Sequence, residues 1–159
     1  MRHSISIKEL VDSIVIALDD QIRPLIKEDK WAASTLRSVT LLLRHISVRV
    51  EEEPHVLGSD NIDSCQVLKT IRPLVADDVE LERLIDEVLN LPVPFCDIVS
   101  VVSYNQRCQM VAERLLQYCA AMRGTAGGDT IRRELRAYLR RRLDRESHLY
   151  FPLFTEPPF

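Results

Sequence analysis

The sequence has little glycine, no paired cysteines and no long apolar run. Only 4 of its 159 residues are Gly, well below the usual share of about 7%, and this scarcity favours helices over loop-rich folds. The 4 Cys form no C-x-x-C pair, so we expect reduced thiols in a cytoplasmic protein. No uncharged apolar stretch approaches the roughly 20 residues that cross a bilayer, and acidic residues interrupt the apolar run near the N-terminus, which argues against a signal peptide. We therefore expect no membrane association.

The residues that are present predict an all-α fold, an antiparallel bundle of five to six helices in a single domain over residues 1–159. Hydrophobic residues make up 46% of the chain and charged residues 28%, which is ordinary for a globular protein of this length. The expected elements are a first helix within 1–28, a second over 29–53, two shorter helices within 59–90, a proline-rich connector at 91–96, two long helices within 97–148 and an aromatic tail at 149–159.

Local signals set these boundaries. Ser6 and Glu9 have the spacing of a capping box, and Asp29 and Asp97 are candidate caps of later helices. Pro54 is expected to end the second helix, with a loop around Gly58. The last helix is expected to start at 129. We expect the first, second, fifth and sixth helices to form the core.

The second predicted helix carries an apolar seam of the kind found in bundles and coiled coils. Its apolar residues alternate steps of four and three along the chain: Ala32, Leu36, Val39, Leu43, Ile46 and Val50. Such a seam indicates a partner helix, in the same chain or in another molecule.

Charge is unevenly distributed. Residues 1–60 carry a net charge of −2, residues 61–100 carry −5 and residues 101–159 carry +4, within a total of −3. The positive charge is concentrated in the arginine-rich helix at 131–145, where Arg133, Arg136 and Arg140 are candidate contact residues. Three interpretations stay open: a solvated or ion-paired face, a docking surface for an acidic protein segment, and a nucleic-acid contact.

The C-terminal tail is rich in aromatic residues. Eight of the nine aromatics lie at or after Phe95, and four fall in the last ten residues. If exposed, these side chains would form a patch of a size that monomers avoid. We expect the tail to be buried, against its own bundle or in a groove of another molecule. The candidate contact residues are Tyr150, Phe151, Leu153, Phe154 and Phe159.

No constellation of catalytic or metal-binding residues stands out. Glu52 and His55 form one E-x-x-H pair, whereas carboxylate-bridged di-iron bundles need two copies. There is no G-x-S-x-G elbow, and the glycines before the last helix are not followed by a lysine. Cys96, in the proline-rich connector, is the one cysteine that we expect to be reactive. We expect no cofactor, no metal and no catalytic residues.

Two segments resemble a known group of proteins. Residues 51–61 are similar to its acidic end of the second helix followed by an apolar loop and a D-N turn, and residues 115–124 with 135–139 are similar to its C-terminal helix pair. The group comprises small helical bacterial proteins of unknown function found beside acyl-CoA dehydrogenases and aminoglycoside-phosphotransferase-like kinases. The resemblance covers about half the chain and implies an accessory cytosolic role, with no active-site residues to transfer.

Together these observations favour a non-catalytic interaction or accessory protein that self-associates or binds a protein partner, such as an enzyme encoded nearby. Two alternatives remain. One is a helical bundle or enzyme that binds a small molecule or acyl ligand in a pocket between helices. The other is nucleic-acid binding through the helix at 131–145, which the acidic net charge disfavours.

Overall fold

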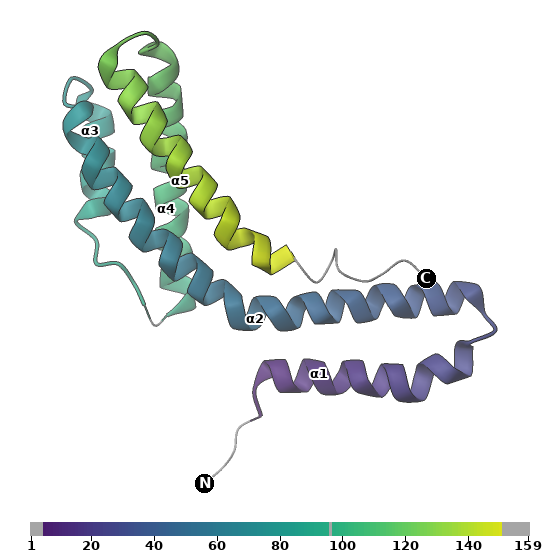
Figure 1. Ribbon diagram of the computed structural model, residues 1–159. Helices are drawn as coiled ribbons and strands as arrows, with labels where there is room; N and C mark the ends of the chain where they lie inside the picture. The colour runs from purple at the N-terminus through teal and green to yellow at the C-terminus, as the bar shows by residue number, and fades with distance from the viewer. Residues whose placement is uncertain (1–4, 96, 151–159) are drawn as a thin grey trace. The chain divides into compact units, whose positions relative to one another are not determined.

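A computed structural model describes residues 5–95 and 97–150, apart from the side chains of His148 and Tyr150, and these residues contain five α-helices and no strand (Figure 1). The all-α class is confirmed. The helices are α1 (Ile7–Ala17), α2 (Lys30–Ile71), α3 (Val79–Leu89), α4 (Ile98–Ala121) and α5 (Ala126–Tyr150). A π-helical turn over Leu18–Ile22 and a 3-10 turn over Arg23–Ile26 follow α1, and a second 3-10 turn over Arg72–Leu74 follows α2.

Most helix ends lie where local signals place them. Ser6 and Glu9 form the predicted capping box, with the Ser6 amide donating to Glu9 Oε2 at 2.7 Å and the Glu9 amide to Ser6 Oγ at 3.1 Å. The carboxylates of Asp29 and Asp97 accept from the first free amides of α2 and α4. Gly124 follows α4 with a φ of 82°, a conformation that glycine adopts without steric cost.

The predicted end of the second helix at Pro54, and the loop around Gly58, were wrong. α2 continues through both residues to Ile71. A proline inside a helix costs about 3 kcal/mol, because its ring removes one amide donor and crowds the preceding turn. Beyond Pro54, the helical backbone aligns Asp60 and Ser64 for buried hydrogen bonds to α4 and α5, and these interactions offset that cost.

The last helix also begins earlier than predicted. α5 starts at Ala126 and not at Asp129, so the two glycines at 127 and 128 belong to its first turn. Thr125 takes the capping role, because its hydroxyl accepts a hydrogen bond from the Gly128 amide at 3.1 Å.

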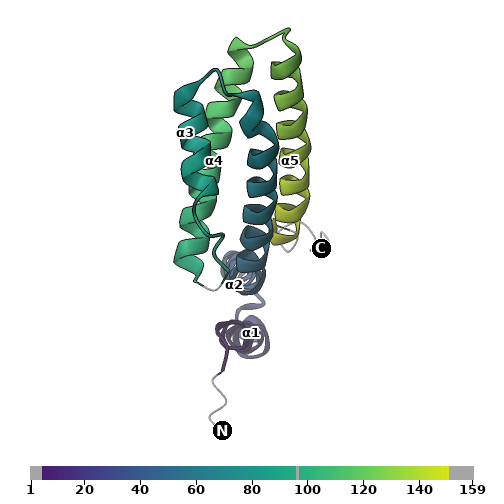
Figure 2. The ribbon, with the colours of Figure 1, turned by 90° about the vertical axis from the view of Figure 1, so that its left-hand side faces the viewer.

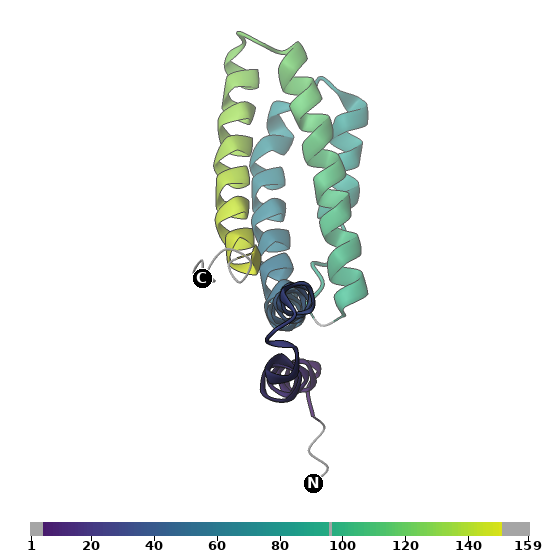
Figure 3. The same ribbon diagram turned by 90° about the vertical axis from the view of Figure 1, so that its right-hand side faces the viewer.

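The chain divides into two compact units. The first comprises residues 1–53 with 146–159. Its described N-terminal part, in which α1 lies antiparallel to the first part of α2, is called the hairpin (Figure 1). The second comprises residues 54–145 and is called the bundle. In the bundle, the second part of α2 runs beside α3, α4 and α5, as Figures 2 and 3 show from opposite sides.

The largest buried apolar cluster lies entirely in the bundle, where all four of its helices contribute to it. Its fully buried members are Ile71, Val75, Leu81, Ile85, Leu115 and Ile131. The prediction that the first and second helices form the core with the two C-terminal ones was wrong. α3 and the second part of α2 pack against α4 and α5 to form the core instead, and α3 places Leu81, Ile85 and Val88 on one buried face.

Candidate interaction site

The two helices of the hairpin are joined mainly by polar contacts. Along their line of contact only Val11, Val15 and Leu36 are buried apolar side chains, and Thr40 and Ser47 are buried beside them. Polar pairs span the contact: Ser47 Oγ donates to Asp12 Oδ1 at 2.8 Å, Lys8 pairs with Glu51 at 3.3 Å and Arg44 pairs with Asp19 at 3.3 Å. The hairpin therefore encloses little apolar surface of its own.

Most apolar side chains of the hairpin are instead exposed. Seven of them, each between 40% and 62% exposed, define what is called here the hairpin face: Ile7, Leu10, Ile14, Val39, Leu42, Ile46 and Val50. Three of them, Val39, Ile46 and Val50, belong to the predicted six-residue seam of the second helix. Of the six seam residues, Leu36 alone is buried in this structure, and Ala32 and Leu43 are half-buried.

These side chains lie on one side of the hairpin. At 100° per residue, the exposed stripe of α1 is turned about 110° from the side that contacts α2, and the stripe of α2 is turned by about the same angle in the same rotational sense. Because the two helices are antiparallel, equal rotations bring both stripes to the same side. Ile16, which is 60% exposed, lies on a different side of α1.

A buried polar cluster lies in the bundle, and sequence reasoning missed it. Asp60, whose side chain is 3% exposed, accepts hydrogen bonds from Asn105 Nδ2 at 2.8 Å, Tyr138 Oη at 3.0 Å and Arg145 Nη2 at 2.7 Å. Ser64 Oγ donates to Tyr138 Oη at 2.8 Å. The cluster joins α2, α4 and α5, and it satisfies a carboxylate that would otherwise be costly to bury.

Burial keeps two side chains at this cluster, Tyr138 and Cys108, protonated near neutral pH. Burial raises the pKa of the Tyr138 hydroxyl to about 12. Burial, with a further contribution from the Asp60 carboxylate, raises the pKa of the Cys108 thiol to about 12. Both groups stay protonated near neutral pH, so neither is poised as a base or a nucleophile there. The hydrogen bonds of the cluster align the three helices.

The arginines of α5 are divided between two faces. Arg141 and Arg145 contact Asp63 at 2.7 Å and 2.9 Å, so one face docks on α2 within the chain. The predicted residues Arg133, Arg136 and Arg140 share the other, exposed face, where they border a shallow groove of about 400 Å³ floored by Ala137.

These three exposed arginines are called the arginine strip. Arg133 pairs with Glu134 at 3.5 Å. Arg136 and Arg140 make no ion pair within the described part of the chain.

The aromatic candidates cannot be placed in the same way. Tyr150 is the last residue of α5, but its side chain lies outside what the structure describes, as do Phe151, Leu153, Phe154 and Phe159.

The described residues bring together no group of three or more His, Cys, Asp and Glu side chains that could hold a metal ion. None of the described helices has the combination of length and apolar character that crossing a membrane requires.

Comparison with known proteins gives no relative to which the chain can be assigned. No family model, no curated protein and no solved structure matches it.

Proposed function

We propose that the protein is a non-catalytic interaction protein that self-associates through the hairpin face. The observation that carries this proposal is the exposed apolar stripe on both helices of one hairpin. From their exposed fractions, the seven side chains leave roughly 600 Å² of apolar surface open, at the upper end of the largest patches on typical monomers. Two copies of the face would bury about 1,200 Å² together, the lower bound for a stable specific interface.

A second copy of this chain is the occupant that the hairpin geometry favours. Two helices in contact leave their apolar faces open on one side, whereas two hairpins placed face to face form a four-helix bundle with a closed core. In a twofold dimer, the stripe of each helix would pack against the α1 or α2 stripe of the second copy. Both arrangements suit a face made of similar aliphatic residues on both helices. The seam spacing of three and four residues is the spacing that such packing uses.

Nucleic-acid binding has weaker support. Arg141, Arg142 and Arg145 face carboxylates of α2, which leaves the arginine strip for phosphate contacts. Three arginines can neutralise only a few phosphates. The few counterions released give weak binding at physiological salt.

The test compares two sets of substitutions in the full chain by light scattering after size exclusion. Leu10→Glu with Ile46→Glu places two charges within the hairpin face and is expected to give the mass of a single chain. The control, Ile16→Glu, changes a side chain of the same kind and similar exposure on another side of α1, and it should leave the wild-type mass unchanged.

Two results would count against the proposal. One is a wild-type mass of a single chain at high concentration. The other is a wild-type protein that associates and whose mass falls equally with the substitutions in the hairpin face and with the control substitution. Circular dichroism of every variant establishes that the helices are retained, so that a change in mass reports on association.

A further inference from the structure

Within the bundle, α3 and α4 border an apolar groove of about 550 Å³. Leu84 and Val88 of α3 line it from one side, and Met110 and Val111 of α4 from the other. Val88 and Val111 are buried, while Met110 is 66% exposed at the edge of the groove. This volume lies within the range of about 300–1,000 Å³ that small-molecule sites occupy.

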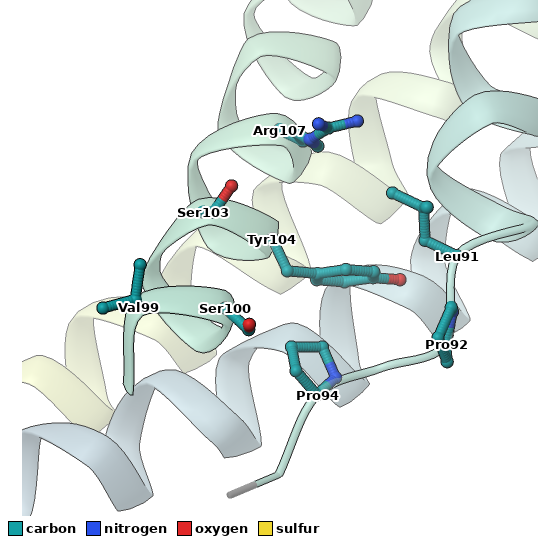
Figure 4. Close-up of a pocket in the computed structure, with 8 residues that line it drawn as sticks. All are labelled: Leu91, Pro92, Pro94, Val99, Ser100, Ser103, Tyr104 and Arg107. Carbon is teal, nitrogen blue, oxygen red and sulfur yellow. The ribbon is translucent and has the colours of Figure 1, made fainter. Parts of the chain in front are cut away.

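Towards the connector between α3 and α4, the groove meets a second pocket of about 420 Å³ (Figure 4). Arg107 lines both cavities and so marks the point where they meet. Figure 4 shows Arg107 projecting from α4 one turn beyond Ser103, with the ring of Tyr104 below it and Leu91 and Pro92 across the pocket. A charged group therefore stands between two apolar cavities.

The charges around the groove distinguish Arg107 from its neighbours. Glu87 is paired with Arg83, and Glu80 lies 3.9 Å from Arg114 across the groove. In contrast, Arg107 makes no hydrogen bond or ion pair with any residue that the structure describes. A guanidinium with all its donors open beside an apolar groove is suited to bind an anion whose remaining part is apolar.

We propose that this groove binds an anionic amphiphile, an unbranched aliphatic chain that ends in a carboxylate. The carboxylate lies on the Arg107 guanidinium, whose planar fork matches it with two parallel hydrogen bonds. The Ser103 hydroxyl, four residues earlier on the same face of α4, is close enough along the helix to add a donor. The chain lies along Leu84, Val88, Met110 and Val111, where it removes apolar surface from water.

The test uses decanoate as the probe and calorimetric titration of the full chain as the measurement. Arg107→Gln should weaken decanoate binding about tenfold or more, the range expected when a charge-assisted hydrogen bond is removed. Arg136→Gln is the matched control, since Arg136 is an exposed arginine of another helix that makes no ion pair with the described residues, and it should bind as the wild type does. 1-Decanol and hexanoate, which lack the charge or most of the chain, should each bind at least tenfold more weakly.

A second pair of variants tests the place of the chain. Met110→Asp puts a charge at the edge of the groove and should abolish binding, whereas Leu143→Asp changes a side chain of the same 66% exposure on α5 and should not. Amide chemical shifts should move at residues 84–91 and 103–111 on addition of decanoate.

The proposal is overturned if Arg107→Gln and Arg136→Gln bind decanoate equally, or if 1-decanol binds as tightly as decanoate. Shifts confined to the hairpin face would overturn it too, and they would leave the self-association proposal untouched. The proposal is also overturned if millimolar decanoate gives neither binding heat nor chemical-shift changes.

Discussion

Replacing Asp60 with alanine should destabilise the bundle by about 3–5 kcal/mol, the range found when one partner of a buried charged pair is removed. The carboxylate is almost fully buried and accepts from Asn105, Tyr138 and Arg145. Its removal leaves the Tyr138 hydroxyl without its acceptor, at about 1–3 kcal/mol. Asn105 Nδ2 loses one of its two hydrogen bonds and keeps the one to Asn61 Oδ1 at 2.9 Å. Arg145 still pairs with Asp63 at 2.9 Å, so the loss of unfolding free energy is smaller than if all three partners of Asp60 were left unpaired.

The free energy of unfolding from urea titrations at one fixed protein concentration measures this effect. Asp60→Asn keeps the shape and one acceptor oxygen, so it should lose about half as much. Asp129→Ala removes an exposed carboxylate that is paired only with Arg132 on its own helix, and it should cost at most about 0.5 kcal/mol. A loss below about 1 kcal/mol for Asp60→Ala would refute the view that this cluster aligns α2, α4 and α5.

Three further predictions concern acid stability, thiol reactivity and the proline of α2. Burial tends to raise the pKa of Asp63, but hydrogen bonds from Arg141 and Arg145 outweigh this effect and hold the pKa below its usual value. The stability that the Asp63 carboxylate contributes is therefore present above about pH 4 and is lost as the pH falls further. Asp63→Asn should make the urea midpoint less sensitive to pH between 6 and 3, and an unchanged acid limb would contradict this. In the folded protein a thiol reagent at pH 8 should modify the buried Cys108 slowly, because burial raises the pKa of its thiol to about 12; in a variant whose other three cysteines are serine, fast modification without denaturant would contradict this. Pro54→Ala restores an amide donor inside α2 and should raise the urea midpoint, by roughly 1–3 kcal/mol in unfolding free energy; a lower midpoint would indicate that the proline is needed where it is.

The sequence predicted those features that depend on neighbouring residues. The capping box of Ser6 and Glu9 and the caps at Asp29 and Asp97 each involve a few consecutive residues, and each is present. The first of the two long helices predicted within 97–148 is present as α4, although its first turns are rich in β-branched residues. Such signals act within one turn of backbone, so the rest of the fold does not alter them.

Features that depend on distant residues were mispredicted or missed. Pro54 ends a helix by its local chemistry, but the buried bonds of Asp60 to α4 and α5 keep α2 helical beyond it. One signal for the cluster was present: Asp60 and Ser64 fall on the same helical face as Leu68 and Ile71 when α2 is read as continuous. The exposed hairpin face was not predicted, because an apolar stripe does not say whether its partner lies in the same chain.

The arginine-rich helix shows the same limit. The sequence named Arg133, Arg136 and Arg140 as contact candidates, but it did not show that other arginines of the same helix pair with Asp60 and Asp63. These pairs follow from the position of α2 beside α5, which depends on the packing of the whole bundle (Figure 2).

Self-association through the hairpin face is the central claim, and the molar mass of the unmodified chain tests it most directly. Sedimentation equilibrium over a hundredfold range of concentration measures this mass without a partner or a probe. The chain has a mass of 18.3 kDa, and we predict a mass that rises to twice this value with increasing concentration. A mass of one chain across the whole range would contradict the claim.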